Sequence, residues 1–225
     1  RLPLAGADAP NVHHLRTKDD ADQLAEDLVA GARIVVIGMG VVGAEVAASG
    51  RKAGCQVIVI EPAPVAMIRT IGKRFGGWIA SQHNAKGVDT RFGVGIDGLM
   101  LGPDGRVEVV NLSDGTQIAC DAVVVGIGIV PAVNLARDAG LAIGNGIIVD
   151  QQCRTSNPHV FAAGDVADQL DFFGGRTRLE TYQNAADQGA AAAAAMLGET
   201  PEFCKPCWFW SDQYDLKLQI AGLGA

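Results

Sequence analysis

Three glycines in the chain have the spacing of a phosphate-binding turn. Gly38, Gly40 and Gly43 follow an apolar, β-branched run and open a helical, alanine-rich segment. Gly38 permits a tight turn from strand to helix, Gly40 lets the backbone approach a pyrophosphate, and Gly43 allows close packing of helix on strand. The N-terminus of that helix offers free N–H groups and the positive end of its dipole to the phosphates. The spacing therefore predicts a dinucleotide-binding turn.

An acidic residue stands where such a turn needs a partner for the ribose. Glu61 ends the next apolar run, 18 residues after Gly43. Its carboxylate can accept hydrogen bonds from both ribose hydroxyls, and its charge repels a 2′-phosphate. Glycines at this spacing also occur in ordinary tight turns, but the accompanying strands, helix and acid favour a binding unit. We therefore expect NADH to be preferred over NADPH.

A strand, a helix and a second strand must position these residues. Ile34–Ile37 and Val57–Ile60 are short apolar runs, typical of strands that are buried on both faces. Between them, Val42–Ala53 has the composition of a helix. The three elements predict a parallel βαβ unit.

The segment before this unit predicts a lead-in and a linking helix. Residues 1–16 are rich in Pro, Gly and Ala and indicate irregular structure, with His13 and His14 at the surface. Thr17 stands as an N-cap before acidic residues, and Gly31 ends the predicted helix.

The segment after the unit predicts another helix and another strand. Ile71–Lys86 is expected to be helical, with Trp78, Ile79 and Ala85 as core contacts. Val88–Phe92 is expected to form a short strand.

Extended runs separated by tight-turn signals come next. The Asp-Gly pairs at 104–105 and 114–115 supply positive φ angles, so the runs 99–101, 106–110 and 116–118 predict an antiparallel meander. Ala122–Val125 then returns as a buried strand, closed by Gly126, Ile127 and Gly128. The expected fold class is α/β, with a Rossmann-like parallel sheet and an antiparallel β-meander inserted before its last strand.

The second half of the chain predicts smaller elements. Residues 132–139 are expected to form a short helix, and residues 146–149 a strand. A further strand is expected at Val160–Ala163, running into Gly164 and Asp165.

The last part of the chain combines a strong helix with an aromatic tail. Residues 168–180 predict a loop that concentrates the charges of Arg176, Arg178 and Glu180. Thr181 is placed to cap a helix that runs to Leu197. An aromatic-rich stretch follows, and the final apolar run from Gln219 predicts a strand without neighbours.

Composition and charge limit the classes of partner. The net charge of −7, without a basic stripe or tail, argues against nucleic acid. Neither an apolar run of membrane-spanning length nor a signal peptide is present. Because the chain begins at Arg1 rather than Met, we expect the natural N-terminus to lie upstream. An odd number of scattered cysteines, five in all, suits a reducing cytosol, so a cytoplasmic location is expected.

One cysteine pair has a spacing known from redox and zinc sites. Cys204 and Cys207 form a CxxC sequence, but no second Cys or His pair with metal spacing accompanies it. The histidines lie far away in sequence, at 13, 14, 83 and 159. We therefore expect the pair to be incidental, and we expect no metal site.

Several separated motifs together resemble one enzyme family. The chain resembles the FAD-dependent, NADH-linked ferredoxin reductases of the putidaredoxin-reductase and biphenyl-dioxygenase-reductase type, in the pyridine nucleotide-disulfide oxidoreductase superfamily. The resemblance covers nearly the whole chain in family order. It rests on these segments: RLPLAGAD, LRTKDDA, VVIGMGVVGAEVA, Glu61, VVVGIGIVP, TSNPHVFAAGD, RLETYQNAADQG and WFWSDQYDLKLQIAG.

The resemblance implies a role for each matching residue near NADH. Glu45 would approach the nicotinamide carboxamide, Glu61 would hold the adenosine ribose, and Arg69 would lie near the adenosine end. The opposite wall would be Gly126, Ile127 and Gly128. The residues implied to line the pyrophosphate are Gly38, Gly40, Val41, Val42 and Gly43.

The resemblance also implies contacts with FAD. Asp165 would accept a hydrogen bond from the ribityl chain, and Glu180 would belong to the same site. Thr181 and Tyr182 would direct their helix N-terminus at the pyrimidine edge of the flavin, where reduced flavin carries negative charge. Trp210 would pack near the isoalloxazine.

The chain departs from the family pattern at single residues and in extent. Met39 replaces a small residue, Val41 replaces a frequent aromatic, and Tyr182 replaces a common Trp. Reductases of this kind begin with a second glycine motif for FAD and end with an extra domain, and this sequence shows neither. The expected domains are a lead-in at 1–32, an NAD(H)-binding domain at 33–128, the second half of an FAD-binding domain at 129–203, and the start of a C-terminal domain at 204–225.

The resemblance implies electron transfer from NADH through FAD to a [2Fe–2S] ferredoxin that serves an oxygenase. Another NADH-dependent flavin disulfide or peroxide reductase is an alternative, because its redox cysteine would lie outside this sequence. A third reading is an NADH-sensing flavoprotein of the apoptosis-inducing-factor type. No side-chain acid or base is required by the first reading, and the oligomeric state stays open.

Overall fold

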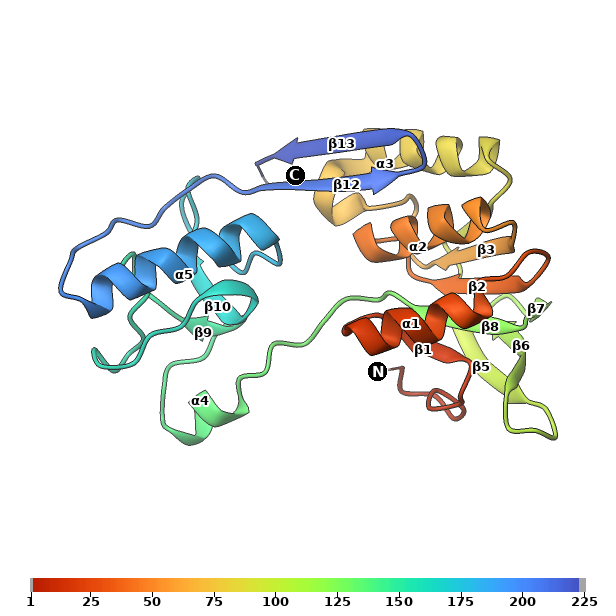
Figure 1. The fold of residues 1–225 in the computed structure, drawn as a ribbon, viewed down its shortest axis with the longest axis horizontal. Coiled ribbons are helices and arrows are strands. Elements are labelled where there is room, and N and C mark those ends of the chain that lie inside the picture. Colours follow the sequence, from red (N-terminus) through yellow and green to blue (C-terminus); the bar gives the residue numbers. More distant parts are fainter. Residues whose placement is uncertain (1, 223–225) are drawn as a thin grey trace. The chain divides into compact units, whose positions relative to one another are not determined.

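The computed structural model describes residues 2–222, and these residues form two compact units (Figure 1). Unit 1 comprises residues up to 128 together with 211–218. Unit 2 comprises residues 129–210 together with the segment that starts at 219. None of the helices within residues 2–222 has the length and hydrophobicity that a membrane-spanning helix requires.

A parallel sheet forms the centre of unit 1. Its strand order is β1-β8-β2-β3-β4, and each neighbouring pair is parallel. The central strands are continuous apolar runs because both faces of the sheet are covered. The strands are β1 (Val12–His14), β2 (Arg33–Ile37), β3 (Gln56–Glu61), β4 (Asp89–Phe92) and β8 (Ala122–Val125).

Helices cover one face of this sheet, and an antiparallel meander covers the other (Figure 1). Alternate residues of β2 show the two faces: Ile34 and Val36 pack in the helical layer, whereas Val35 and Ile37 pack in the meander layer. The helices are α1 (Lys18–Asp27), α2 (Val41–Lys52) and α3 (Ile68–Ala85). The meander strands are β5 (Ile96–Leu101), β6 (Val107–Leu112) and β7 (Gln117–Ala119). The predicted parallel sheet with an inserted meander is confirmed.

The lead-in of unit 1 is more ordered than the sequence indicates. The irregular structure expected over residues 1–16 is wrong at β1, which pairs with β8 at the sheet edge. His13 is buried rather than at the surface, and its Nε2 lies 2.7 Å from Asp27 Oδ2 on α1. The short run Val12–His14 lacks the apolar character of a central strand, and so its pairing is invisible in the sequence pattern.

Helix boundaries follow the predicted caps at some ends only. Thr17 caps α1 with a full capping box, as expected. α3 starts earlier than predicted, at Ile68, and Gly72 has non-helical angles inside it. Trp78 and Ala85 were expected in the core, but both are exposed, while Ile79 is buried.

Unit 2 is built around a small sheet and one long helix. β10 is parallel to β9 and antiparallel to β11. Unit 2 has two small clusters of buried apolar residues. One consists of Val149, Ala162 and Ala167, and the other of Cys153, Ala192 and Phe203. The elements are α4 (Asn134–Asp138), β9 (Ile147–Ile148), the 3₁₀ turn η1 (Gly164–Val166), β10 (Ala167–Leu170), β11 (Arg176–Thr177) and α5 (Tyr182–Met196).

In unit 2, β9 lies within the strand predicted at 146–149, but the other strands are displaced from the predicted one. Val160–Ala163 was expected to be a strand, but in this segment only Phe161 forms a bridge, to Arg154. β10 and β11 lie in the range 168–180 that was expected to be a loop. The pattern hides β10 because Asp168 and Gln169 are polar, yet both are buried and hydrogen-bonded.

The tail forms a hairpin. β12 (Trp208–Gln213) and β13 (Leu216–Ala221) make a two-stranded sheet, so the strand that was expected to lack neighbours has a partner. Leu223, in the last predicted apolar run, lies outside the described residues. Tyr214 sits in the turn with a positive φ of 58°, a conformation that non-glycine residues rarely adopt.

Candidate functional site

The glycine turn lies where neighbouring parallel strands of unit 1 end. The backbone N–H of Gly38 donates to Ile60 O of β3 (2.8 Å), and that of Gly126 donates to Ile37 O of β2 (2.8 Å). From β2 the chain proceeds to β3 and β4 on one side, while β8 and β1 lie on the other. Such a switch point, at the carboxyl ends of the strands, is where open α/β sheets bind ligands.

Two of the glycines are required by close backbone contacts. A Cβ on Gly38 would lie 2.5 Å from the Gly126 carbonyl oxygen, and φ at Gly38 is +94°. A Cβ on Gly43 would lie 2.0 Å from the Gly38 carbonyl oxygen. No other residue type fits either position without a backbone shift.

The third glycine faces open space. A Cβ on Gly40 would meet no atom within 4 Å. Gly40 is the N-cap of α2, and among the described residues no side chain caps this helix. The first N–H groups of α2 are therefore available to an anion, with Val41 and the exposed Val42 beside them.

Glu61 is tied into this turn. Its Oε2 accepts a hydrogen bond from the backbone N–H of Met39 (2.7 Å), and its Oε1 accepts one from that of Ala63 (2.8 Å). Each carboxylate oxygen keeps a further lone pair, so Glu61 can still accept from two hydroxyl groups. The same side chain thus orders the glycine turn and keeps acceptor capacity for hydroxyl donors of a ligand.

The remaining residues predicted around a dinucleotide lie in unit 1 at different depths. Glu45 on α2 is partly buried, and its Oε1 accepts a hydrogen bond from Ser211 Oγ (2.7 Å). Arg69 is exposed in the first turn of α3, and no ion pair joins it to Glu61 within residues 2–222.

Gly126 packs against the backbone of Gly43, and Ile127 is half exposed. Gly128 has a φ of +104°.

A second group of predicted residues lies in unit 2. Asp165 sits in η1, and its carbonyl oxygen accepts a hydrogen bond from Arg178 Nη1 (3.0 Å). Arg178 also forms an ion pair with Glu180 (2.7 Å). The backbone N–H of Gly164 donates to the buried side chain of Gln188 on α5 (2.7 Å), which fixes the turn against that helix.

The N-terminus of α5 carries the other residues of this group. Thr181 Oγ1 accepts from the backbone N–H of Asn184 (3.3 Å), as predicted for an N-cap. Tyr182 is largely exposed and contacts Trp210 edge-to-face, with ring centroids 6.1 Å apart. The ring centroids of Trp210 and Trp208 are 5.6 Å apart. The rings of Tyr182, Trp208 and Trp210 together form an exposed aromatic surface.

Sequence reasoning missed the residues that support Glu45. Ser211 and Gln213 of β12 and His83 of α3 are fully buried. Their signals were present: Ser211 and Gln213 alternate on one face of a strand, and His83 continues the buried stripe of Gly76, Ile79 and Ala80.

The cysteines do not form a reactive cluster. Each of the five is a free thiol, and among residues 2–222 no group of His, Cys, Asp or Glu side chains could hold a metal ion. Cys207 is buried, and this burial, with a smaller contribution from Asp171, raises the pKa of its thiol. A raised pKa lowers the thiolate fraction, and the thiolate is the reactive form.

Replacing both Cys204 and Cys207 by Ser is expected to leave NADH affinity unchanged within about twofold, because both belong to unit 2 whereas the glycine turn and Glu61 belong to unit 1. The binding constant of the double variant can be compared with that of the parent chain by titration calorimetry. A large loss of affinity at unchanged thermal stability would contradict this expectation.

Comparison with known proteins agrees with these observations. Residues 1–189 match the family described as pyridine nucleotide-disulphide oxidoreductase, and residues 208–225 match a reductase C-terminal domain. The chain therefore belongs to the pyridine nucleotide-disulphide oxidoreductase family.

Individual relatives narrow the class. Rhodocoxin reductase of Rhodococcus erythropolis is 41% identical over 225 residues, which are all of this chain and 52% of the relative. The crystal structure of a ferredoxin reductase from Rhodopseudomonas palustris superposes with a TM-score of 0.94 at 41% identity, over 99% of this chain and 55% of that one. The covalent putidaredoxin reductase–putidaredoxin complex gives a TM-score of 0.95 at 36% identity, with the same coverage. The chain thus spans about half the length of the relatives that it matches.

Proposed function

We propose that the chain is part of an NADH-dependent flavoprotein reductase that transfers electrons to a [2Fe–2S] ferredoxin serving an oxygenase. The observation that carries the NADH part is the glycine turn, with its open face at Gly40 and with Glu61 bonded to it. The ferredoxin part is supported by two relatives that are named ferredoxin reductases and that match over 99% or more of this chain.

In this proposal, unit 1 holds NADH by its backbone more than by its side chains. The uncapped N–H groups of α2 bind the pyrophosphate, and Gly40 leaves room for it. Glu61 accepts hydrogen bonds from the adenosine ribose, and Glu45 accepts one from the nicotinamide carboxamide. Arg69 lies at the adenosine end, and residues 126–128 form the opposite wall.

Unit 2 contributes one side of an FAD site in this proposal. When bound, FAD supplies the change from two-electron to one-electron chemistry. Asp165 accepts from the ribityl chain, with its turn held by Arg178 and flanked by Glu180. Thr181 holds the first turn of α5, whose remaining N–H groups face the pyrimidine edge, and Tyr182 and Trp210 lie against the ring.

The same proposal assigns the domains. Residues 33–128 form the NAD(H)-binding domain, 1–32 lead into it, 129–203 are the second half of the FAD-binding domain, and 204–225 begin the C-terminal domain. Large exposed apolar side chains on unit 2, such as Val130, Leu135 and Phe173, support its assignment as part of a larger domain. Five free thiols support a reducing, cytoplasmic location.

The test of the proposed function is NADH-dependent reduction of a [2Fe–2S] ferredoxin by the full-length protein with FAD bound. Rapid bleaching of the ferredoxin's visible absorbance is expected. NADH oxidation that proceeds only with a disulfide, persulfide or peroxide as acceptor would instead assign the protein to the other branch of the family.

The 225-residue chain alone is expected to bind NADH and to purify without colour. Unit 1 has its own sheet, helices, meander and core, so its nucleotide site does not depend on further residues. For FAD, the contacts proposed within residues 2–222 are those with the ribityl chain and the ring, and a glycine turn for the FAD pyrophosphate is not among these residues. An absorbance spectrum and an NADH titration of the purified chain check both statements. A stoichiometric flavin band would contradict the second of them.

A further inference from the structure

A continuous series of hydrogen bonds connects Glu45 with the turn of the β12–β13 hairpin, within unit 1. Ser211 Oγ lies 2.7 Å from Glu45 Oε1, and Gln213 Nε2 lies 3.0 Å from Ser211 Oγ. Gln213 Oε1 is 2.9 Å from His83 Nε2, and the Tyr214 hydroxyl is 3.0 Å from His83 Nδ1. We call these five residues the Glu45 relay.

The middle of the relay is closed to water. Ser211, Gln213 and His83 have 0% exposed surface. Buried polar side chains are costly unless each is hydrogen-bonded, and here every one of the three has partners on both sides. The three buried side chains therefore form a fully hydrogen-bonded network in the interior of unit 1.

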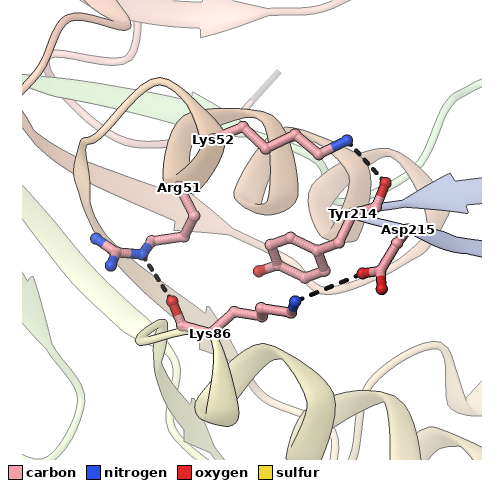
Figure 2. Close-up of a pocket in the computed structure, with 5 residues that line it drawn as sticks. All are labelled: Arg51, Lys52, Lys86, Tyr214 and Asp215. Atoms are coloured by element: carbon pink, nitrogen blue, oxygen red, sulfur yellow. Dashed lines mark hydrogen bonds and ion pairs between the residues drawn. The ribbon is translucent and has the colours of Figure 1, made fainter.

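The outer end of the relay, Tyr214, lies in a pocket that is otherwise lined by charged residues. Figure 2 shows Tyr214 among Arg51, Lys52, Lys86 and Asp215. Lys52 Nζ donates to the Tyr214 carbonyl oxygen (2.8 Å), and Lys86 Nζ lies 3.5 Å from Asp215 Oδ1 and 5.7 Å from the centre of the Tyr214 ring. These contacts hold the turn in which Tyr214 has its positive φ.

The hydrogen-bond directions follow from the charge at the inner end. A carboxylate only accepts, so Ser211 must donate to Glu45 and accept from the Gln213 amide nitrogen. The Gln213 oxygen then faces His83, which must carry its proton on Nε2 and accept from Tyr214 on Nδ1. Burial lowers the pKa of His83, against a smaller opposing effect of its hydrogen bond to Gln213, and this favours the neutral ring that the series requires.

We propose that Ser211, Gln213, His83 and Tyr214 are positioning residues that hold the Glu45 carboxylate for the nicotinamide carboxamide. The relay occupies Oε1 of Glu45 and leaves Oε2 to accept from an N–H donor of the ligand. The Gln213 amide does not readily pass protons, so the relay transmits orientation and not a proton. This inference rests on the proposed NADH site.

The relay makes a prediction about ligands that differ only at the carboxamide. The 225-residue chain is titrated with NADH, with the analogue in which a carboxylate replaces the carboxamide, and with ADP-ribose, which lacks the nicotinamide. The parent chain is expected to bind NADH at least about tenfold more tightly than the acid analogue, because the carboxylate of the analogue and that of Glu45 repel each other.

Ser211→Ala is expected to weaken NADH binding about tenfold and ADP-ribose binding less than about twofold. Asp212→Asn, an exposed neighbour on the same strand, is the matched control and should change neither.

A spectroscopic measurement separates positioning from packing. ¹⁵N NMR of the imidazole should show His83 neutral and protonated on Nε2 in the parent chain. Tyr214→Phe removes the donor to Nδ1 while keeping the ring, and should shift the His83 Nδ1 resonance and weaken NADH binding more than ADP-ribose binding. Equal losses for NADH and ADP-ribose in both variants, or a His83 ring protonated on Nδ1, would overturn the relay. If the parent chain binds none of the three ligands, the proposed function itself fails.

Discussion

Replacement of Gly43 by Ala is expected to abolish NADH binding, with at least a 100-fold loss of affinity, and to destabilise unit 1 by about 2–4 kcal/mol. The added methyl carbon would lie 2.0 Å from the Gly38 carbonyl oxygen, which is a backbone atom and cannot rotate away. Either α2 moves off β2 or the turn distorts, and both changes remove the N–H groups from the pyrophosphate. Chemical denaturation and NADH titration of the same preparation measure the two effects.

Gly40→Ala separates binding from stability. Its methyl group meets no protein atom within 4 Å, and φ at Gly40 is −73°, which alanine adopts freely. The stability cost should be at most about 1 kcal/mol, the difference between good and poor N-cap residues. NADH affinity should still fall by about tenfold or more, because the methyl group occupies the face that the pyrophosphate approaches. Unchanged NADH binding in Gly40→Ala would place the nucleotide elsewhere.

The sequence could predict this turn because its chemistry is local. Gly38, Gly40 and Gly43 are close in the sequence. At each position the predicted turn, ligand approach or helix packing leaves no room for a side chain. Even Glu61 is separated from them by only one helix and one strand. The contact of Gly38 with Gly126 is different, because Gly126 directly follows β8, the strand after the meander, and only the assembled sheet brings the two backbones together.

The surroundings of Glu45 were not predictable in the same way. Ser211 is 166 residues away from Glu45, and its hydroxyl carries no pattern that names its partner. In the sequence, His83 stands far from the cysteine pair and from the other histidines, which argues only against a metal site. A polar side chain within an apolar helix stripe indicates that this side chain is buried. The pattern does not indicate which group will be its hydrogen-bond partner.

Unit 2 shows where hydrophobic periodicity fails. β10 contains Asp168 and Gln169, whose partners Arg176 and Asn184 satisfy them inside the unit. The apolar run Val160–Ala163 looked like the strand instead. The polar residues of β10 are recognisable as strand residues only with their partners in place, and therefore β10 and β11 are missed, whereas β9 lies within its predicted range. The helix α5 is predicted well because its cap at Thr181 is local.

Replacement of Glu61 by Ala is expected to weaken NADH binding about 30-fold without producing an NADPH-binding protein. Removing the charge abolishes the repulsion of a 2′-phosphate, which alone would favour NADPH. However, Glu61 also accepts hydrogen bonds from the backbone N–H groups of Met39 and Ala63, and both lose their partner in the variant. Hydrogen bonds to a charged group contribute about 1.5–3 kcal/mol each, so the turn that binds the pyrophosphate of either nucleotide loses its support.

Titration of the parent chain and of Glu61→Ala with NADH and NADPH checks this expectation. The parent chain should bind NADH at least about tenfold more tightly than NADPH, in line with a repulsion of about 1–3 kcal/mol after screening. Glu26→Ala, an exposed acid on α1 with the same change in charge, is the control for long-range electrostatics. If Glu61→Ala bound NADPH as tightly as the parent chain binds NADH, the two backbone hydrogen bonds would not support the turn. Glu61 would then act through its charge alone, as the sequence pattern by itself suggests.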